Sequence, residues 1–146
     1  MKEYQVKVYK DRTEWYFNGK LHREDGPAIE YSDGYKFWFF NGERHRVDGP
    51  AVEYPSGNKY WYLNGKRHRV DGPAIEYSDG SKLWYLNGQY HREDGRAVEY
   101  LDGTKYWYIN GKLHTEEEFN DKINPKSCSV KIVEIDGKKY KLQEVK

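Results

Sequence analysis

The spacing of tryptophan and histidine constrains the fold of this chain more than any other feature. A histidine follows each tryptophan by seven residues, and an Asn-Gly dipeptide lies between them every time. Self-similarity at a fixed period is the signature of a repeat architecture. We therefore predict a tandem array of about five units with a period of 23 residues, set by Trp15, Trp38, Trp61, Trp84 and Trp107 and by His22, His45, His68, His91 and His114.

Two turn signals divide each unit into hairpins. Asp-Gly, as at Asp79-Gly80, separates two short runs rich in aromatic and β-branched residues and predicts a tight turn. Asn-Gly, as at Asn87-Gly88, strongly predicts a type I′ turn, so the chain reverses again. Asp71-Gly72-Pro73 then forms a corner, because proline cannot donate to a strand ladder. The pattern predicts an all-β fold of tandem β-hairpin repeats.

The two ends depart from the repeat and predict caps. Thr115 and Glu118 have the spacing of a helix capping box, and a short helix should run to about Ile123. Strands at 130–135 and 140–145 around an Asp-Gly turn predict a final hairpin. The expected parts are an N-terminal capping strand at 1–9, five repeats at 10–114, and a C-terminal helix and β-hairpin cap at 115–146.

Turn lengths predict which side chains share a face of the sheet. If both turns have two residues, Ile29 lies opposite Trp38 and Trp38 lies opposite His45, which gives a packing face. The opposite face is aromatic and charged, and tyrosine and arginine are enriched at protein interfaces. We expect it to bind another protein, with these candidate residues: Glu30, Phe39, Arg44, Glu53, Tyr62, Arg67, Glu76, Tyr85, Tyr90, Glu99 and Tyr108.

A second candidate surface is a row of arginines beside the corners. Such a row could hold phosphates or carboxylates through bidentate contacts. The alternative is pairing with carboxylates of neighbouring units, because 25 Lys and Arg are balanced by 24 Asp and Glu. The members of this alternative anion ladder are Arg23, Arg46, Arg69 and Arg92.

The repetition argues against catalysis and against metal binding. A His-x-x-Asp pair occurs four times, whereas catalysis needs one special site. Equivalent histidines should lie about 10 Å apart, two strand spacings, which is too far for shared ligation of zinc. We expect no catalytic residue, metal or cofactor, and histidines that stack on tryptophan and bond an Asp or a backbone carbonyl.

The charge balance and the absence of long apolar segments limit the partners. A net charge of +1 is atypical of proteins that bind nucleic acid non-specifically. No window resembles a transmembrane span or a signal peptide, which predicts a cytoplasmic protein without transmembrane contact. The single Cys128 supports no internal disulfide.

Two strings of each unit carry a resemblance to a known family. Asn64-Gly65-Lys66-Arg67-His68, followed by Tyr77-Ser78-Asp79-Gly80 and an aromatic strand, resembles the MORN repeat over roughly residues 10–114. The chain is also similar to MORN-variant repeat proteins of bacteria and their viruses, some of which are described as antitoxin-like. The resemblance implies an elongated, single-layer, twisted sheet that serves protein interaction, scaffolding or contact with lipid headgroups, and no enzyme.

These observations lead to two expected functions. The first is a non-enzymatic protein-binding repeat module that inhibits a bacterial toxin or defence protein, the inhibition resting on the resemblance. The second is a binder of phosphorylated small ligands or lipid headgroups through the arginine row. The edge of the C-terminal hairpin is a further expected contact, because it could pair with a second copy of the chain.

Overall fold

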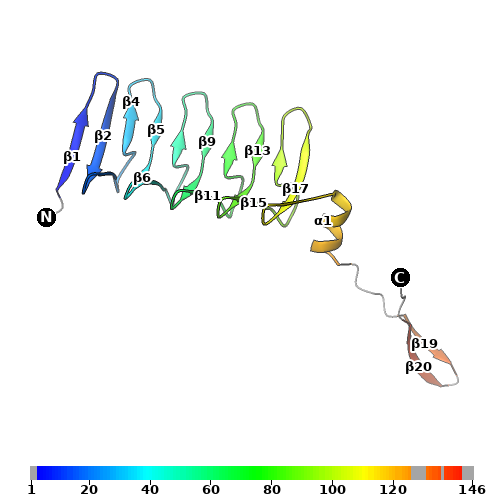
Figure 1. The fold of residues 1–146 in the computed structure, drawn as a ribbon. Coiled ribbons are helices and arrows are strands. Elements are labelled where there is room, and N and C mark those ends of the chain that lie inside the picture. Colours follow the sequence, from blue (N-terminus) through cyan, green and yellow to red (C-terminus); the bar gives the residue numbers. More distant parts are fainter. Residues whose placement is uncertain (1–2, 126–130, 136, 143–146) are drawn as a thin grey trace.

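A single row of antiparallel hairpins forms the body of the protein (Figure 1). The structure is a computed structural model, and it describes residues 3–125, 131–135 and 137–142. The central sheet has twelve strands in the order β1-β2-β4-β5-β8-β9-β12-β13-β16-β17-β18, with β3 paired to β2. Their bounds are β1 Tyr4–Val8, β2 Arg12–Phe17, β3 Lys20–Leu21, β4 Ile29–Tyr31, β5 Lys36–Phe37, β8 Val52–Glu53, β9 Lys59–Tyr60, β12 Ile75–Glu76, β13 Lys82–Leu83, β16 Val98–Glu99, β17 Lys105–Ile109 and β18 Lys112–His114.

Each complete unit has two arms. The first arm is the hairpin whose loop ends at Gly34 or its equivalent, and the second arm is the hairpin closed by Asn-Gly. The all-β class with hairpin repeats and a short C-terminal helix is confirmed. The second arms of the three middle units are β6 Phe39–Phe40 with β7 Glu43–Arg44, β10 Tyr62–Leu63 with β11 Lys66–Arg67, and β14 Tyr85–Leu86 with β15 Gln89–Tyr90.

The register of the first arm differs from the prediction by one residue. Ile29 pairs with Phe37, not with Trp38, because the loop has three residues rather than two. The N–H of Gly34 donates to the carbonyl of Tyr31 at 3.0 Å, and Gly34 has a φ of 96°. A turn followed by a left-handed glycine is the usual three-residue hairpin loop. The shift moves every residue of the first strand to the other face.

The second arm follows the prediction. Asn41 and Gly42 have φ values of 50° and 88°, as a type I′ turn requires. Phe39 pairs with Arg44, and the His45 N–H donates to the carbonyl of Trp38 at 3.2 Å. Tryptophan and histidine therefore lie opposite each other, as expected.

The corrected register defines two faces. We call the side that carries Ile29, Phe37 and their equivalents the tyrosine face, and the side that carries Glu30, Trp38 and their equivalents the tryptophan face. Successive strand residues point to opposite faces. The predicted packing face is therefore wrong for the first arm. Tyr31 and its equivalents share a face with the arginine of the second arm, and the glutamates share a face with tryptophan and histidine.

The core cluster lies mostly on the tyrosine face and combines aliphatic side chains with tyrosine. Ile75, Leu83 and Val98 are at most 2% exposed and lie with buried Tyr85 in one cluster. Half-buried tyrosines from both arms pack around them. The alanine that opens each full unit is completely buried, and its carbonyl accepts a hydrogen bond from the preceding tryptophan, as from Trp61 to Ala74 at 2.8 Å.

Backbone and histidine hydrogen bonds join the second arms of neighbouring units. The N–H of Asn64 donates to Nδ1 of His45 at 3.1 Å. The N–H of Gly65 donates to the carbonyl of Arg44 at 3.0 Å, and the backbone N–H of Arg46 donates to the carbonyl of Tyr62 at 3.1 Å. The histidine partner is thus the turn of the next unit, where the sequence suggested an Asp or a backbone carbonyl. Nδ1 of His45 also lies 2.9 Å from Oδ1 of Asn64.

The ends of the array consist of a strand at the N-terminal side and of a helix and a hairpin at the C-terminal side. Strand β1 pairs with β2 along its whole length. Helix α1, Glu116–Ile123, begins with the Thr115 and Glu118 capping box and buries Phe119. Strands β19, Lys131–Ile135, and β20, Lys138–Leu142, form the last hairpin. Cys128, Val130, Asp136 and Val145 lie outside the described residues.

Candidate binding face

Tyrosine rings stack from unit to unit along the second arms. The rings of Tyr85 and Tyr90 are 4.3 Å apart at an angle of 30°, and those of Tyr90 and Tyr108 are 4.9 Å apart at 28°. Tyr85 pairs with Tyr90 across one Asn-Gly turn, whereas Tyr108 belongs to the next unit. The stack therefore crosses the boundary between units.

Arginine takes the place of the second tyrosine in the two preceding units. The guanidinium of Arg44 lies 5.5 Å from the ring centre of Tyr62, and that of Arg67 lies 5.2 Å from Tyr85. Arg67 also donates to the phenol oxygens of Tyr62 at 3.3 Å and Tyr85 at 3.2 Å. Cations over aromatic rings attract the ring quadrupole. We call the resulting row the aromatic stack: Phe39, Arg44, Tyr62, Arg67, Tyr85, Tyr90 and Tyr108.

A second row of rings runs along the first arms on the same face. Tyr54 and Tyr60 meet edge to face at 5.4 Å, and Tyr60 and Tyr77 at 6.0 Å. Such edge-to-face pairs are the favoured geometry of aromatic contacts. Sequence reasoning placed Tyr31 and, by its repeat, Tyr54 and Tyr77 on the packing face. The signal for the correct face was the loop that follows each of these tyrosines, Ser-Asp-Gly or Pro-Ser-Gly, because a loop of three residues shifts the register by one.

One buried carboxylate lies on the tyrosine face of the first unit, and it is neutralised locally. Glu14 accepts from Arg12 at 2.7 Å and from the Tyr16 hydroxyl at 2.6 Å. Burial of Glu14 opposes ionisation, yet these two hydrogen bonds outweigh it and lower the pKa of Glu14. The hydrogen bond to Glu14 raises the pKa of Tyr16 to about 12.

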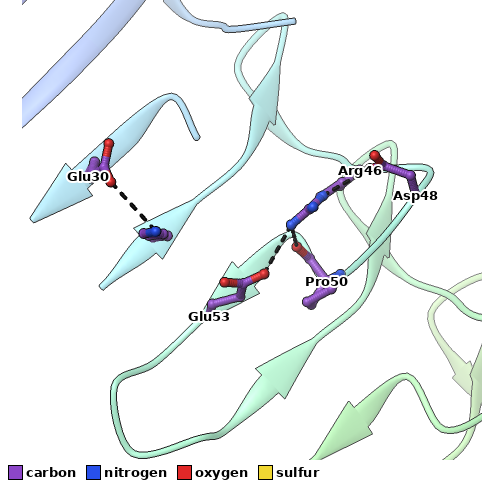
Figure 2. A network of polar contacts seen from close by, with 6 residues as sticks. Glu30, Arg46, Asp48, Pro50 and Glu53 are labelled. Carbon is purple, nitrogen blue, oxygen red and sulfur yellow. Dashed lines mark hydrogen bonds and ion pairs between the residues drawn. The ribbon is translucent and has the colours of Figure 1, made fainter. Parts of the chain in front are cut away.

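The arginines of the predicted anion ladder lie on the tryptophan face, and each of them already pairs with an aspartate there. The guanidinium of Arg46 lies 4.1 Å from the ring centre of Trp38. Its Nε donates to Asp48 at 2.9 Å, and its Nη1 donates to the carbonyl of Pro50 at 3.2 Å and to Glu53 at 3.0 Å. Figure 2 shows the guanidinium between these three groups. The hydrogen bond from Arg46 holds the pKa of Asp48 below its ordinary value.

The same network recurs with one difference in the first unit. Arg69 and Arg92 contact their tryptophan, aspartate and glutamate as Arg46 does. Arg23 keeps its stacking on Trp15 and its bond to Asp25. Glu30, however, pairs with Lys36 at 3.7 Å. The ladder geometry matches the alternative reading of the sequence, pairing with nearby carboxylates.

Shallow hollows lie on the tryptophan face between successive corners. The hollow over Trp61 has a volume of about 550 Å³ and is lined by Leu63, Pro50 and the two corner valines. Val47 and Val70 are 83% and 84% exposed. In the first and fourth units glutamate takes the place of these valines. The exposed corner valines are therefore confined to the middle of the array.

The structure divides the predicted binding residues between the two faces. The tyrosine face brings together all the aromatic and arginine members of the set in the aromatic stack. Tyr85, expected to face solvent, is only 7% exposed and belongs to the core cluster. The four carboxylates do not join them and lie on the tryptophan face: Glu30, Glu53, Glu76 and Glu99.

Two absences concern the part of the chain that the structure describes. In that part of the chain, no three His, Cys, Asp or Glu side chains lie close enough to hold one metal ion. No helix there is long and apolar enough to cross a membrane. No protein-family model matches the sequence, and comparison with curated proteins found no relative.

Proposed function

We propose that the chain is a non-enzymatic protein-binding repeat module and that the tyrosine face is its interface. The observation that carries the proposal is the aromatic stack, which runs through successive units without interruption. Tyrosine and arginine dominate interface hot spots because they combine large contact area with hydrogen-bonding groups. The tyrosine rings and the guanidiniums are held by stacking before any partner arrives, so binding costs little side-chain entropy.

The size and regularity of this face favour a protein over a small ligand. Equivalent side chains recur about every 10 Å, two strand spacings. A small molecule would meet a single unit, whereas a protein surface could contact several units at once. Most of the stack is half-buried, so its rings still offer edges and hydroxyls to a partner.

We further propose that the partner is a bacterial toxin or defence protein in the cytoplasm and that binding blocks it. This part of the proposal rests on the resemblance to antitoxin-like MORN-variant proteins. A rigid array that covers a substrate entrance would inhibit by occlusion and would need no chemistry of its own.

The alternative function, binding of phosphorylated ligands or lipid headgroups by the arginine ladder, is less favoured. Arg46, Arg69 and Arg92 each already bond two carboxylates and a backbone carbonyl. A phosphate would have to displace these groups, and the gain would be small because it exchanges one anion for another.

Capture from the source cell followed by titration tests the proposed interface. The captured protein would be identified by mass spectrometry, expressed, and titrated against purified variants by calorimetry. We expect the pair Tyr54→Ala and Tyr62→Ala to weaken binding by at least about 2 kcal/mol, the size of a hot spot. The control pair Val47→Ser and Val70→Ser, on the tryptophan face, should change it by less than about 0.5 kcal/mol. The reverse result would transfer the interface to the tryptophan face.

A further inference from the structure

Two arginines of the aromatic stack differ from the four arginines of the anion ladder, each of which pairs with an aspartate. Arg46, for example, lies 3.0 Å from Glu53 and 2.9 Å from Asp48. Among the residues that the structure describes, no carboxylate lies within ion-pair distance of Arg44 or Arg67. The tyrosine face therefore carries two positive charges that the rest of this face does not balance.

The surroundings of Arg67 hold its guanidinium ready for an anion. Two phenol oxygens take one N–H each from Nε and Nη1, and the ring of Tyr85 lies beside the group. A guanidinium has five N–H donors, so three remain for a ligand. Arg67 is half-buried, and a partly desolvated cation gains most from a partner of opposite charge. Arg44 is more exposed and lies between the rings of Phe39 and Tyr62.

The two arginines lie in the second and third units, in the middle of the array. The position of Arg44 and Arg67 is taken by leucine in the first and last units and by tyrosine in the fourth. A ligand that runs along the array would thus meet an apolar group, two cations, an aromatic ring and an apolar group in turn. The row that determines this order is Leu21, Arg44, Arg67, Tyr90 and Leu113.

We propose that Arg44 and Arg67 together recognise two carboxylates of an acidic segment in the protein partner. The two arginines are one unit apart, about 10 Å. In a partner segment of polyproline II conformation, side chains three residues apart lie on one side of the chain, about 9 Å from each other. One of the two residues between the carboxylates would lie on the ring of Tyr62, which separates the two guanidiniums. This inference rests on the proposed function and names the chemistry of the partner.

A peptide segment fits this site better than an isolated phosphate. The cations are spaced along the face and separated by a ring rather than gathered around one point. Paired anions with an apolar group between them satisfy both features, and Arg binds carboxylates in a planar, two-bonded geometry.

Selection from a random peptide library tests the inference without a known partner. The purified full chain would be the bait, and we expect enrichment of peptides with two Asp or Glu three residues apart and an aromatic or aliphatic residue between. The affinity of a selected peptide should fall at least about tenfold in Arg44→Gln and in Arg67→Gln, the worth of a charge-assisted hydrogen bond. It should also fall with added salt.

Matched variants keep the test decisive. Lys66→Gln removes a neighbouring charge from the opposite side of the same arm and should change affinity less than about twofold. The described residues show no hydrogen bond of the Arg44 side chain, only its contacts with Phe39 and Tyr62, so its variant stays informative even if Arg67→Gln melts early. Thermal melts of all variants would accompany the binding data.

Each outcome separates this inference from the proposed function. Selected peptides that lack acidic residues yet lose binding in Tyr54→Ala with Tyr62→Ala would overturn the inference and keep the interface. Displacement of the peptide by an equal concentration of inorganic phosphate would show a simple phosphate site and overturn it too. Selection of no peptide, or of peptides indifferent to the tyrosine pair, would count against both proposals.

Discussion

The backbone N–H of Asn87 donates a hydrogen bond of 3.1 Å to Nδ1 of His68, nineteen residues earlier in the chain. Three equivalent bonds join His22 to Asn41, His45 to Asn64 and His91 to Asn110. The Asn-Gly turn thus has two tasks. It reverses its own arm, and it presents a donor to the preceding unit. This explains why the Asn-Gly dipeptide and the histidine repeat together along the sequence.

Replacement of His68 by alanine tests this bond. We expect the free energy of unfolding in urea to fall by about 1 to 2 kcal/mol, because the Asn87 N–H loses its acceptor and the ring leaves a gap. Lys66→Ala, an exposed change in the same arm, should stay within about 0.5 kcal/mol. Equal losses in the two variants would mean that the histidine contributes nothing beyond an ordinary surface residue.

The contact between Trp61 and Arg69 can be measured by a double-mutant cycle. The guanidinium lies 4.0 Å from the ring centre. Trp61→Ala should cost about 3 kcal/mol in urea melts, because the ring packs against the core cluster as well. The coupling with Arg69→Ala should be about 1 kcal/mol. A coupling near zero would show that the two side chains are adjacent without stabilising each other.

Acid should destabilise the array through the aspartates of the corners. Hydrogen bonds from arginine lower the pKa of Asp25, Asp48, Asp71 and Asp94 below 3.8. A lowered folded-state pKa gives stability that is present above the unfolded value and is lost as pH falls through the folded one. Unfolding free energy should therefore decline below pH of about 4. Asp71→Asn should flatten that decline, and an unchanged slope would contradict the assignment.

Alkali should act through two tyrosines. Burial, with a hydrogen bond to Tyr85, raises the pKa of Tyr90 to about 12, and the bond to Glu14 does the same for Tyr16. Unfolded tyrosine ionises near pH 10, so the stability from these groups is complete below about 10 and is lost as pH rises toward 12. Tyrosinate absorbance should show late-titrating groups. Tyr90→Phe should remove one of them, and a titration identical to the parent would refute this reading.

Periodicity and turn chemistry predicted most of the fold from the sequence. The Trp and His spacing, the type I′ turns and the Thr115 capping box follow from local rules, and each is present. The register of the first arm does not follow from Asp-Gly alone, because that dipeptide closes loops of two or three residues. The error of one residue moved Glu30 and Tyr31 to the wrong faces.

The candidate site was predicted less completely for the same reason. Phe39, Arg44 and Tyr62 lie in the second arm, where the turn length was right, and the structure brings them together. Arg46 pairs with carboxylates, whereas Arg67 bonds only tyrosine hydroxyls, and this contrast depends on contacts across units. The sequence does not show how two arginines that stand two residues apart in the second and third units differ, whereas their neighbours in space do.

The hydrogen bonds between second arms, from the Asn-Gly turn to the preceding histidine and between backbone groups, connect only adjacent units. Loss of one unit therefore removes two junctions in the middle of the array but only one at its end. Opening should begin at the outer hairpins and move inward, as in other linear arrays. Amide hydrogen exchange would then be slowest around Ile75 and Leu83. The two unbalanced arginines lie in the second and third units, so the surface that we assign to the partner would remain folded while the ends fray.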